Sequence, residues 1–168
     1  IQPVREEAIA PLERFGRVET IGFDYGQRHA VELSQRPVIR DRLAALKPQW
    51  RERLGSDHVI DLPALGAISE TALTRDVAIA LSENGLPTTF VPGRNLIFLC
   101  FAGALAYRRH TPQLVAGMCE TDYSGYPDCR PEFIAAFEQV ANLATRAGVE
   151  GVERIRVRTP LIELSKAE

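Results

Sequence analysis

The sequence lacks an excess of charge of either sign, since 20 Lys and Arg residues face 22 Asp and Glu residues and leave a formal net charge of -2. This balance argues against non-specific binding of nucleic acid or of an anionic membrane. A long apolar run is missing too, because the longest, residues 96–107, is shorter than the ~20 residues of a membrane-spanning helix. No basic stretch followed by an apolar run opens the chain, so we expect no secretory signal and a cytoplasmic location.

Cysteine is scarce, and its spacing is uninformative for metal binding. The three cysteines, Cys100, Cys119 and Cys129, form no CxxC pair. We expect reduced thiols, and no zinc site can be built from cysteine alone within these residues. Cys100 is predicted to lie in the core. Cys119 and Cys129 flank a polar loop and could line a pocket, although no base beside them in the sequence indicates a nucleophile.

The 168 residues are 45% apolar and 25% charged, as in a soluble globular protein, and they fit a single domain spanning 1–168. Predicted strands alternate with predicted helices. We expect strands at 17–23, 58–62, 88–91, 113–119 and 154–158, with 88–91 either a strand or merely extended. We expect helices at 27–46, 95–108 and 131–147. Residues 63–85 read as short helices and loops. This alternation predicts an α/β fold with a mostly parallel sheet and helices on both faces.

Some of these helices carry internal signals. Pro37 must start, kink or divide the helix over 27–46. The helix over 95–108 is apolar around its circumference, which predicts burial on several sides. In the helix over 131–147, Pro131 suits the first turn and Gly148 is expected to end it.

Three polar loops follow predicted strands or precede helices, at 24–29, 92–95 and 120–130. In open α/β sheets ligands bind beyond the carboxyl ends of the strands, so we expect these loops to share one cleft. Simpler interpretations stay open. Asp24 and Gly26 could form a plain turn, and Gly93 or Asn95 could cap a helix.

The third loop is unusually rich in polar and aromatic side chains for a connection between two elements. Tyrosines offer stacking faces, and Asp and Ser offer acceptors and donors for ring N–H and carbonyl groups. The loop therefore predicts recognition of a flat polar heterocycle. A purely structural loop, with Asp128 capping the following helix, is the alternative.

Other polar residues are less informative. His29, His58 and His110 are scattered, and a lone histidine is more often structural than functional. The arginines at 154, 156 and 158 alternate with apolar residues, which indicates a solvated strand face or, alternatively, a subunit contact.

Four stretches resemble one family, the 7-cyano-7-deazaguanine synthases of queuosine precursor biosynthesis. They are FDYGQRH at 23–29, FVPGRN at 90–95, ETDYSGYPDCRPEF at 120–133 and TPLIELSKAE at 159–168. The resemblance covers residues 12–168, and the string DYSGYPDCR is highly specific. It implies a PP-loop ATP pyrophosphatase with a Rossmann-like sheet of the adenine-nucleotide α-hydrolase type. The implied reaction converts 7-carboxy-7-deazaguanine and ammonia to 7-cyano-7-deazaguanine at the expense of ATP.

The resemblance also implies roles for individual residues. Arg94 and Asn95 would be catalytic. ATP, with Mg, would be bound by four residues: Phe23, Asp24, Tyr25 and Gln27. The deazaguanine would be bound by Glu120, Asp122, Tyr123, Ser124, Tyr126, Asp128 and Arg130. The resemblance further implies that the protein binds zinc and forms a homodimer.

Two family features are absent from these residues. The family's SGGxDS phosphate loop is not present, and no glycine precedes Gly16; the four zinc-binding cysteines are missing as well. We expect that such segments are missing from the sequence, and that residues 1–168 alone do not turn over ATP. Two alternative functions stay open: a non-catalytic nucleotide- or deazaguanine-binding module, and a related PP-loop ligase with another acceptor.

Overall fold

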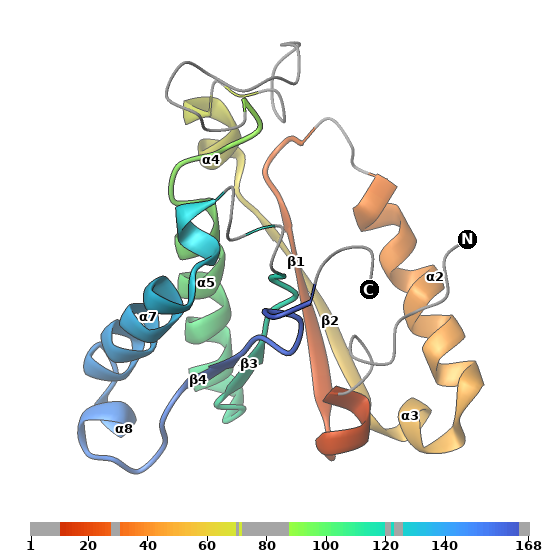
Figure 1. Ribbon diagram of the computed structural model, residues 1–168. Helices are drawn as coiled ribbons and strands as arrows, with labels where there is room; N and C mark the ends of the chain where they lie inside the picture. Colours follow the sequence, from red (N-terminus) through yellow and green to blue (C-terminus); the bar gives the residue numbers. More distant parts are fainter. Residues whose placement is uncertain are drawn as a thin grey trace. The chain divides into compact units, whose positions relative to one another are not determined.

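A computed structural model describes residues 11–27, 31–69, 71, 88–119, 122 and 126–164 (Figure 1). Helices and parallel strand pairs confirm the predicted α/β class. The chain divides into two compact units, Ile1–Val91 and Pro92–Glu168, and the single domain stays a prediction. In the described ranges, no helix is both long and apolar enough to cross a membrane.

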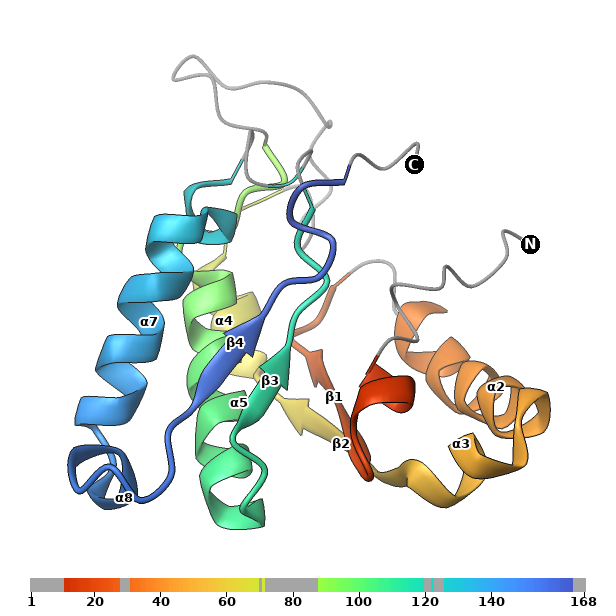
Figure 2. The same cartoon turned by 60° about the horizontal axis from the view of Figure 1, so that its bottom comes forward.

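The first unit is built on a parallel pair of strands, β1 (Val18–Asp24) and β2 (Leu54–Asp61). The helices α2 (Val31–Leu46) and α3 (Pro48–Arg53) connect them and lie along the strands, and α4 (Pro63–Ile68) follows β2 (Figures 1 and 2). After an irregularity between Val18 and Thr20 the register is regular and ends with Asp24 opposite Asp61. The carboxyl ends of both strands therefore meet at one edge.

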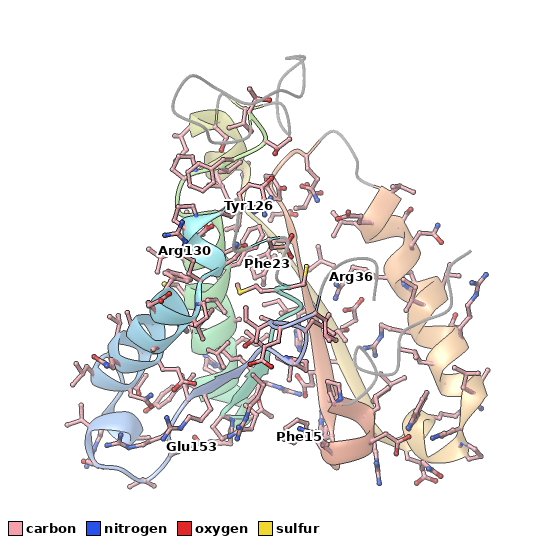
Figure 3. The ribbon with its side chains drawn as sticks, in the orientation of Figure 1. Phe15, Phe23, Arg36, Tyr126, Arg130 and Glu153 are labelled. Atoms are coloured by element: carbon pink, nitrogen blue, oxygen red, sulfur yellow. The ribbon has the colours of Figure 1, made fainter. Side chains whose placement is uncertain are left out.

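Polar contacts hold α2 to these strands, since none of its side chains is buried. Arg36 donates to the carbonyl oxygen of Ile21 at 3.2 Å and forms an ion pair with Asp57 (Figure 3). Arg40 donates to the hydroxyl of Thr20 at 2.7 Å. The apolar periodicity of α2 is correspondingly weak, because arginines perform the attachment that apolar side chains usually provide.

The second unit contains another parallel pair, β3 (Gln113–Val115) and β4 (Arg156–Arg158). Its helices are α5 (Arg94–Arg109), the 3-10 turn η1 (Pro127–Cys129), α7 (Pro131–Leu143) and α8 (Arg146–Val149). Helices α5 and α7 lie side by side against β3 and β4 (Figure 2). The core between them contains Leu99, Met118, Cys129, Ile134, Phe137 and Val157.

Side chains of α7 accept backbone N–H groups of β4 and of the residue before it. The N–H of Ile155 donates to Asn142 Oδ1 at 2.9 Å, and the N–H of Val157 donates to Glu138 Oε1 at 2.6 Å. The intervening N–H of Arg156 donates to the carbonyl oxygen of Pro112, beside β3. As predicted, Ile155 and Val157 are buried while Arg154, Arg156 and Arg158 are exposed.

Pro37 lies inside α2, so it neither starts nor divides the helix, and a kink at this proline stays a prediction. The bounds of another helix are corrected. The helix predicted over 131–147 ends at Leu143. Thr145 then begins α8 by accepting a hydrogen bond from the N–H of Gly148, so Gly148 lies inside α8 rather than terminating the longer helix.

The predictions for α5 and its neighbours were also partly wrong. The residues of α5 buried most deeply, Leu99, Gly103 and Ala106, share one face, as helical spacing requires, whereas Phe101 is 43% exposed. Cys100 is exposed, not part of the core. Residues 88–91 form a turn and irregular chain rather than a strand. The strand predicted over 113–119 is regular only at 113–115, although Met118 and Cys119 beyond it are buried.

Candidate functional site

A cavity of about 540 Å³ opens at the carboxyl ends of β1 and β2. It is lined by Asp24, Tyr25, Gly26, Asp61, Pro63, Gly66 and Ala67. Its volume falls within the ~300–1,000 Å³ of small-molecule sites, and its position beyond the carboxyl ends of parallel strands is where α/β proteins bind ligands. The two carboxylates at its wall can accept hydrogen bonds from a ligand, or bind a cation, and cannot donate when ionised.

The first polar loop is a tight turn at the edge of this cavity. The Asp24 carboxylate accepts a hydrogen bond from the N–H of Gly26 at 3.1 Å, and Gly26 has a φ of 76°, which favours glycine. Gln27 accepts from the N–H of Tyr25 at 3.0 Å and donates to the carbonyl oxygen of Phe23 at 3.1 Å. The turn interpretation and the ligand interpretation of this loop are therefore compatible, with Gln27 bracing the loop.

Of the four residues predicted to bind ATP, two line the cavity and one lies next to it in the chain. Asp24 and the buried Tyr25 line it, and Phe23 is half-buried in β1 just before it (Figure 3). Gln27 is not among the lining residues, and both ends of its amide form hydrogen bonds with the loop backbone.

The contribution of β2 and α4 to this wall was not predicted from the sequence. Asp61 ends β2 opposite Asp24. It stands next to the last residue of the strand predicted over 58–62, and this position near a strand's carboxyl end was the signal that could have found it. Gly66 could not have been found this way. A Cβ atom at Gly66 would lie 2.0 Å from the carbonyl oxygen of Tyr25, so only glycine lets α4 approach the loop so closely.

In the second unit, the predicted catalytic pair begins α5. Asn95 donates its backbone N–H to Asp128 Oδ2 at 3.0 Å, and its side-chain amide donates to Cys129 Sγ at 3.1 Å. The guanidinium carbon of Arg94 lies 6.0 Å from the centroid of the Phe98 ring, one turn along the helix. The structure thus brings the Pro-Gly-Arg-Asn loop at 92–95 together with the end of the loop over 120–130, here called the tyrosine-rich loop.

The aspartates of the tyrosine-rich loop are turned toward protein groups. Asp122 Oδ2 accepts from both the N–H and the thiol of Cys119, each at 3.2 Å. The backbone carbonyl of Asp122 accepts from the N–H of Tyr126 at 2.8 Å, and Tyr126 packs against the core. Arg130 is exposed at the start of α7 (Figure 3). Glu120, Tyr123 and Ser124 lie outside the described residues.

Cys129 is buried in this cluster, at 4% exposure. The pKa of its thiol is raised to about 11, chiefly by burial and also by the negative charges of Asp128 and Asp122, while Arg94 and Asn95 oppose the rise. The thiol is therefore protonated at neutral pH, which agrees with the interpretation of an inert cysteine.

One further polar contact is structural. His58 Nε2 lies 2.8 Å from Glu19 Oε2 on the β1–β2 pair, which agrees with a non-functional histidine. Among the residues that the structure describes, no group of three or more His, Cys, Asp or Glu side chains could hold a metal ion.

Comparison with known proteins matches the family model "Queuosine biosynthesis protein QueC" to residues 8–168. A protein of Gluconacetobacter diazotrophicus named 7-cyano-7-deazaguanine synthase is 60% identical over 157 residues, which cover 94% of this chain and 62% of that protein. Proteins of the same name from Gluconobacter oxydans and Bradyrhizobium sp. (strain BTAi1) are 57% and 58% identical over 94% and 93% of this chain. The chain spans about 62% of the length of these relatives. The chain belongs to the QueC family of queuosine biosynthesis proteins.

Proposed function

We propose that this chain is part of an ATP-dependent enzyme that converts 7-carboxy-7-deazaguanine and ammonia into 7-cyano-7-deazaguanine. The observation that carries the proposal is the 60% identity, across 94% of the chain, to a protein named for this synthase. The cavity at the carboxyl ends of β1 and β2 supports it, because a nucleotide-dependent α/β enzyme needs a ligand site at that edge.

The finer fold assignment is part of the proposal. Each unit contains one strand–helix–strand segment with parallel strands. Such segments are the building blocks of a Rossmann-like sheet with helices on both faces. Membership of the family supports this arrangement of the PP-loop type.

The reaction needs two activations, because a carboxylate is a poor electrophile and two oxygens must leave. In the first step, the substrate carboxylate displaces pyrophosphate from ATP and becomes an acyl-adenylate. Ammonia then attacks the acyl carbon, AMP leaves, and the primary amide forms with loss of a proton. A second ATP activates the amide oxygen in the same way, and loss of AMP and a proton leaves the nitrile. Binding energy that orients the reactants is the protein's main contribution.

We assign the nucleotide to the cavity of the first unit. Asp24 and Asp61 would accept hydrogen bonds from ribose hydroxyls or the adenine amino group, or hold the Mg that accompanies ATP. The buried Tyr25 and the half-buried Phe23 would provide the apolar side. Gln27 would act by bracing the loop.

In the second unit, Arg94 would offset negative charge on phosphate or on the acyl oxygen, and Asn95 would support it. The loop 120–130 would bind the deazaguanine. Within that loop the candidates to contact the base are Glu120, Asp122, Tyr123, Ser124, Tyr126 and Arg130, from the set that the resemblance predicted together with Asp128. Zinc would be bound by other parts of the protein, since the described residues offer no suitable group. A cytoplasmic homodimer stays a prediction.

The test is release of pyrophosphate by the protein expressed from its complete gene. We expect release that requires both ATP and 7-carboxy-7-deazaguanine, and nitrile formation that also requires ammonia. ATP binding without any pyrophosphate release would instead favour a binding module. Release with another acceptor, but not with 7-carboxy-7-deazaguanine, would favour a different PP-loop ligase.

A further inference from the structure

The first turn of α5 lacks a cap of its own. Gly93 occupies the N-cap position, has no side chain, and has a φ of 71° instead of the extended backbone of a normal cap. A helix begins with backbone N–H groups that have no partner within the helix, so an acceptor must come from elsewhere.

Asp128 supplies that acceptor from η1. Its carboxylate accepts the N–H of Asn95 at 3.0 Å, although the two residues are 33 positions apart. The amide of Asn95 returns a contact to the backbone carbonyl of Asp128 at 3.5 Å and a hydrogen bond to Cys129 Sγ at 3.1 Å. The pair resembles a capping box, in which two residues at a helix start bond each other reciprocally, but it is assembled from two distant segments.

Burial and charge strengthen this contact. Asp128 is 9% exposed, so water competes poorly for its carboxylate. A negative charge at the N-terminus of a 16-residue helix is also favourable, because the helix dipole is positive there. The contact therefore fixes the start of α5, where Arg94 and Asn95 lie, to the segment 127–129.

We propose that Asp128 is a positioning residue, which caps α5 and thereby holds Arg94 and Asn95 in place, rather than a residue that binds the base. This proposal replaces the role that the resemblance implied for Asp128, and its catalytic consequence rests on the proposed function. A carboxylate that already accepts from the backbone at a helix start has less capacity for a ligand.

The first test measures the cap directly and needs no substrate. In the protein expressed from its complete gene, amide hydrogen exchange at Asn95 should accelerate at least about tenfold in Asp128→Ala, because the N–H loses its partner. Asp128→Asn keeps an amide oxygen as acceptor and should accelerate exchange less. Unchanged exchange at Asn95 in Asp128→Ala would overturn the capping claim. Asp41→Asn, an exposed change on α2, serves as the matched control and should leave exchange unchanged.

The second test separates positioning from contact with the base. Asp128→Asn should lower kcat about 10- to 100-fold, as a small misplacement of catalytic groups does, while the Kd for 7-carboxy-7-deazaguanine changes less than about threefold. In an Arg94→Ala background, Asp128→Asn should lower kcat little further, because it acts by displacing the first residues of α5. A Kd raised tenfold or more with kcat kept, or full additivity with Arg94→Ala, would overturn the proposal.

Failure of the proposed function and failure of the capping claim can be told apart. If the wild-type protein neither binds 7-carboxy-7-deazaguanine nor releases pyrophosphate, the proposed function is wrong, and the exchange at Asn95 still decides whether Asp128 caps α5. Circular dichroism and thermal unfolding of each variant establish that a lost activity is not lost folding. If Asp128→Ala does not fold, exchange at Asn95 in Asp128→Asn, which should still exceed the wild-type rate, takes its place.

Discussion

Asp24 and Asp61 are direct register partners at the carboxyl ends of two parallel strands, and both line the same cavity. Their placement follows from the parallel pairing, which brings the last residues of both strands to one edge. The Asp24 carboxylate accepts the N–H of Gly26, whereas the carboxylate of the exposed Asp61 has no hydrogen bond or ion pair with the residues that the structure describes. Asp61 is therefore the better probe of a ligand in the cavity.

We predict that Asp61→Ala weakens ATP binding by the protein expressed from its complete gene. Loss of one acceptor to a bound ligand costs about 1–3 kcal/mol, or about 5- to 150-fold in Kd. Isothermal titration calorimetry measures the effect. Asp41→Ala, which removes a carboxylate from the exposed side of α2, should leave the Kd unchanged. Equal affinities in wild type and Asp61→Ala would exclude Asp61 from the nucleotide site.

Gly66 tests how closely α4 must approach the Tyr25 loop. In Gly66→Ala the new Cβ would meet the carbonyl oxygen of Tyr25 at 2.0 Å, so the backbone must move. We expect a loss of about 1–3 kcal/mol in unfolding free energy and weaker ATP binding. Gly16→Ala is the control, because nothing lies within 4 Å of a Cβ there. If Gly66→Ala and Gly16→Ala have the same unfolding free energy and the same Kd for ATP, the close approach of α4 contributes to neither stability nor nucleotide binding.

The cysteines should differ sharply in reactivity. With a pKa of about 11, Cys129 has a thiolate fraction of about one in a thousand at about pH 8, whereas the exposed Cys100 is open to reagent. Iodoacetamide should alkylate Cys100 in the native protein and leave Cys129 intact, as mass spectrometry of peptides would report. Because the folded pKa is raised, the thiol's contribution to stability is complete below about pH 9 and is lost as the pH rises toward 11. Native Cys129 reacting as fast as Cys100 would contradict this environment.

Asp57 should contribute stability at neutral pH that is lost in acid. Burial raises the pKa of its carboxyl, but hydrogen bonds from Thr20 and Arg36 and the charges of nearby arginines outweigh burial, so the pKa lies below its ordinary value. A lowered carboxylate pKa gives stability that is present above about pH 4 and is lost as the pH falls further. Asp57→Asn should lower the unfolding free energy at neutral pH by about 0.5–1 kcal/mol, a value discounted for partial exposure. The difference from wild type should shrink in acid, and a constant difference down to about pH 2 would show that the charge is not responsible.

Arg94 should matter for turnover more than for folding. Its guanidinium packs near Phe98 and is half-buried, so Arg94→Lys keeps the charge but loses the planar fork that binds two oxygens at once. We expect kcat to fall at least about tenfold with an unchanged melting temperature. Arg108→Lys, at the exposed end of the same helix, is the control. Wild-type turnover in Arg94→Ala would show that Arg94 is not a catalytic residue.

The parts of the structure that depend on local pattern could be predicted from the sequence. The strand over 17–23, the alternation of Ile155 and Val157 with arginines, and the turn at Asp24 all follow from residue type and spacing. The attachment of α2 by Arg36 could not be predicted, because an arginine that reaches a strand resembles a solvated one in sequence.

The same limit applies to the candidate site. The loops were found because polar residues cluster after predicted strands, but their internal contacts depend on residues far apart in the chain. Asp128 satisfies the N–H of Asn95, 33 positions away, and Asp122 turns back on Cys119. The sequence shows an aspartate in a polar loop but does not show whether its carboxylate binds a ligand or the N-terminus of a helix. The sequence alone therefore favoured a ligand-binding role for Asp128.

The most direct test of the proposed function is the fate of labelled ammonia. The protein expressed from its complete gene would be incubated with 7-carboxy-7-deazaguanine, ATP, Mg and ¹⁵N-ammonium, and products followed by mass spectrometry. We expect ¹⁵N in the nitrile of 7-cyano-7-deazaguanine, with one pyrophosphate released for each of the two oxygens lost, and we expect Asp61→Ala and Arg94→Ala to reduce both products together. A folded wild-type protein that binds both substrates yet forms neither labelled nitrile nor pyrophosphate would contradict the assignment of this chain to a nitrile-forming synthase.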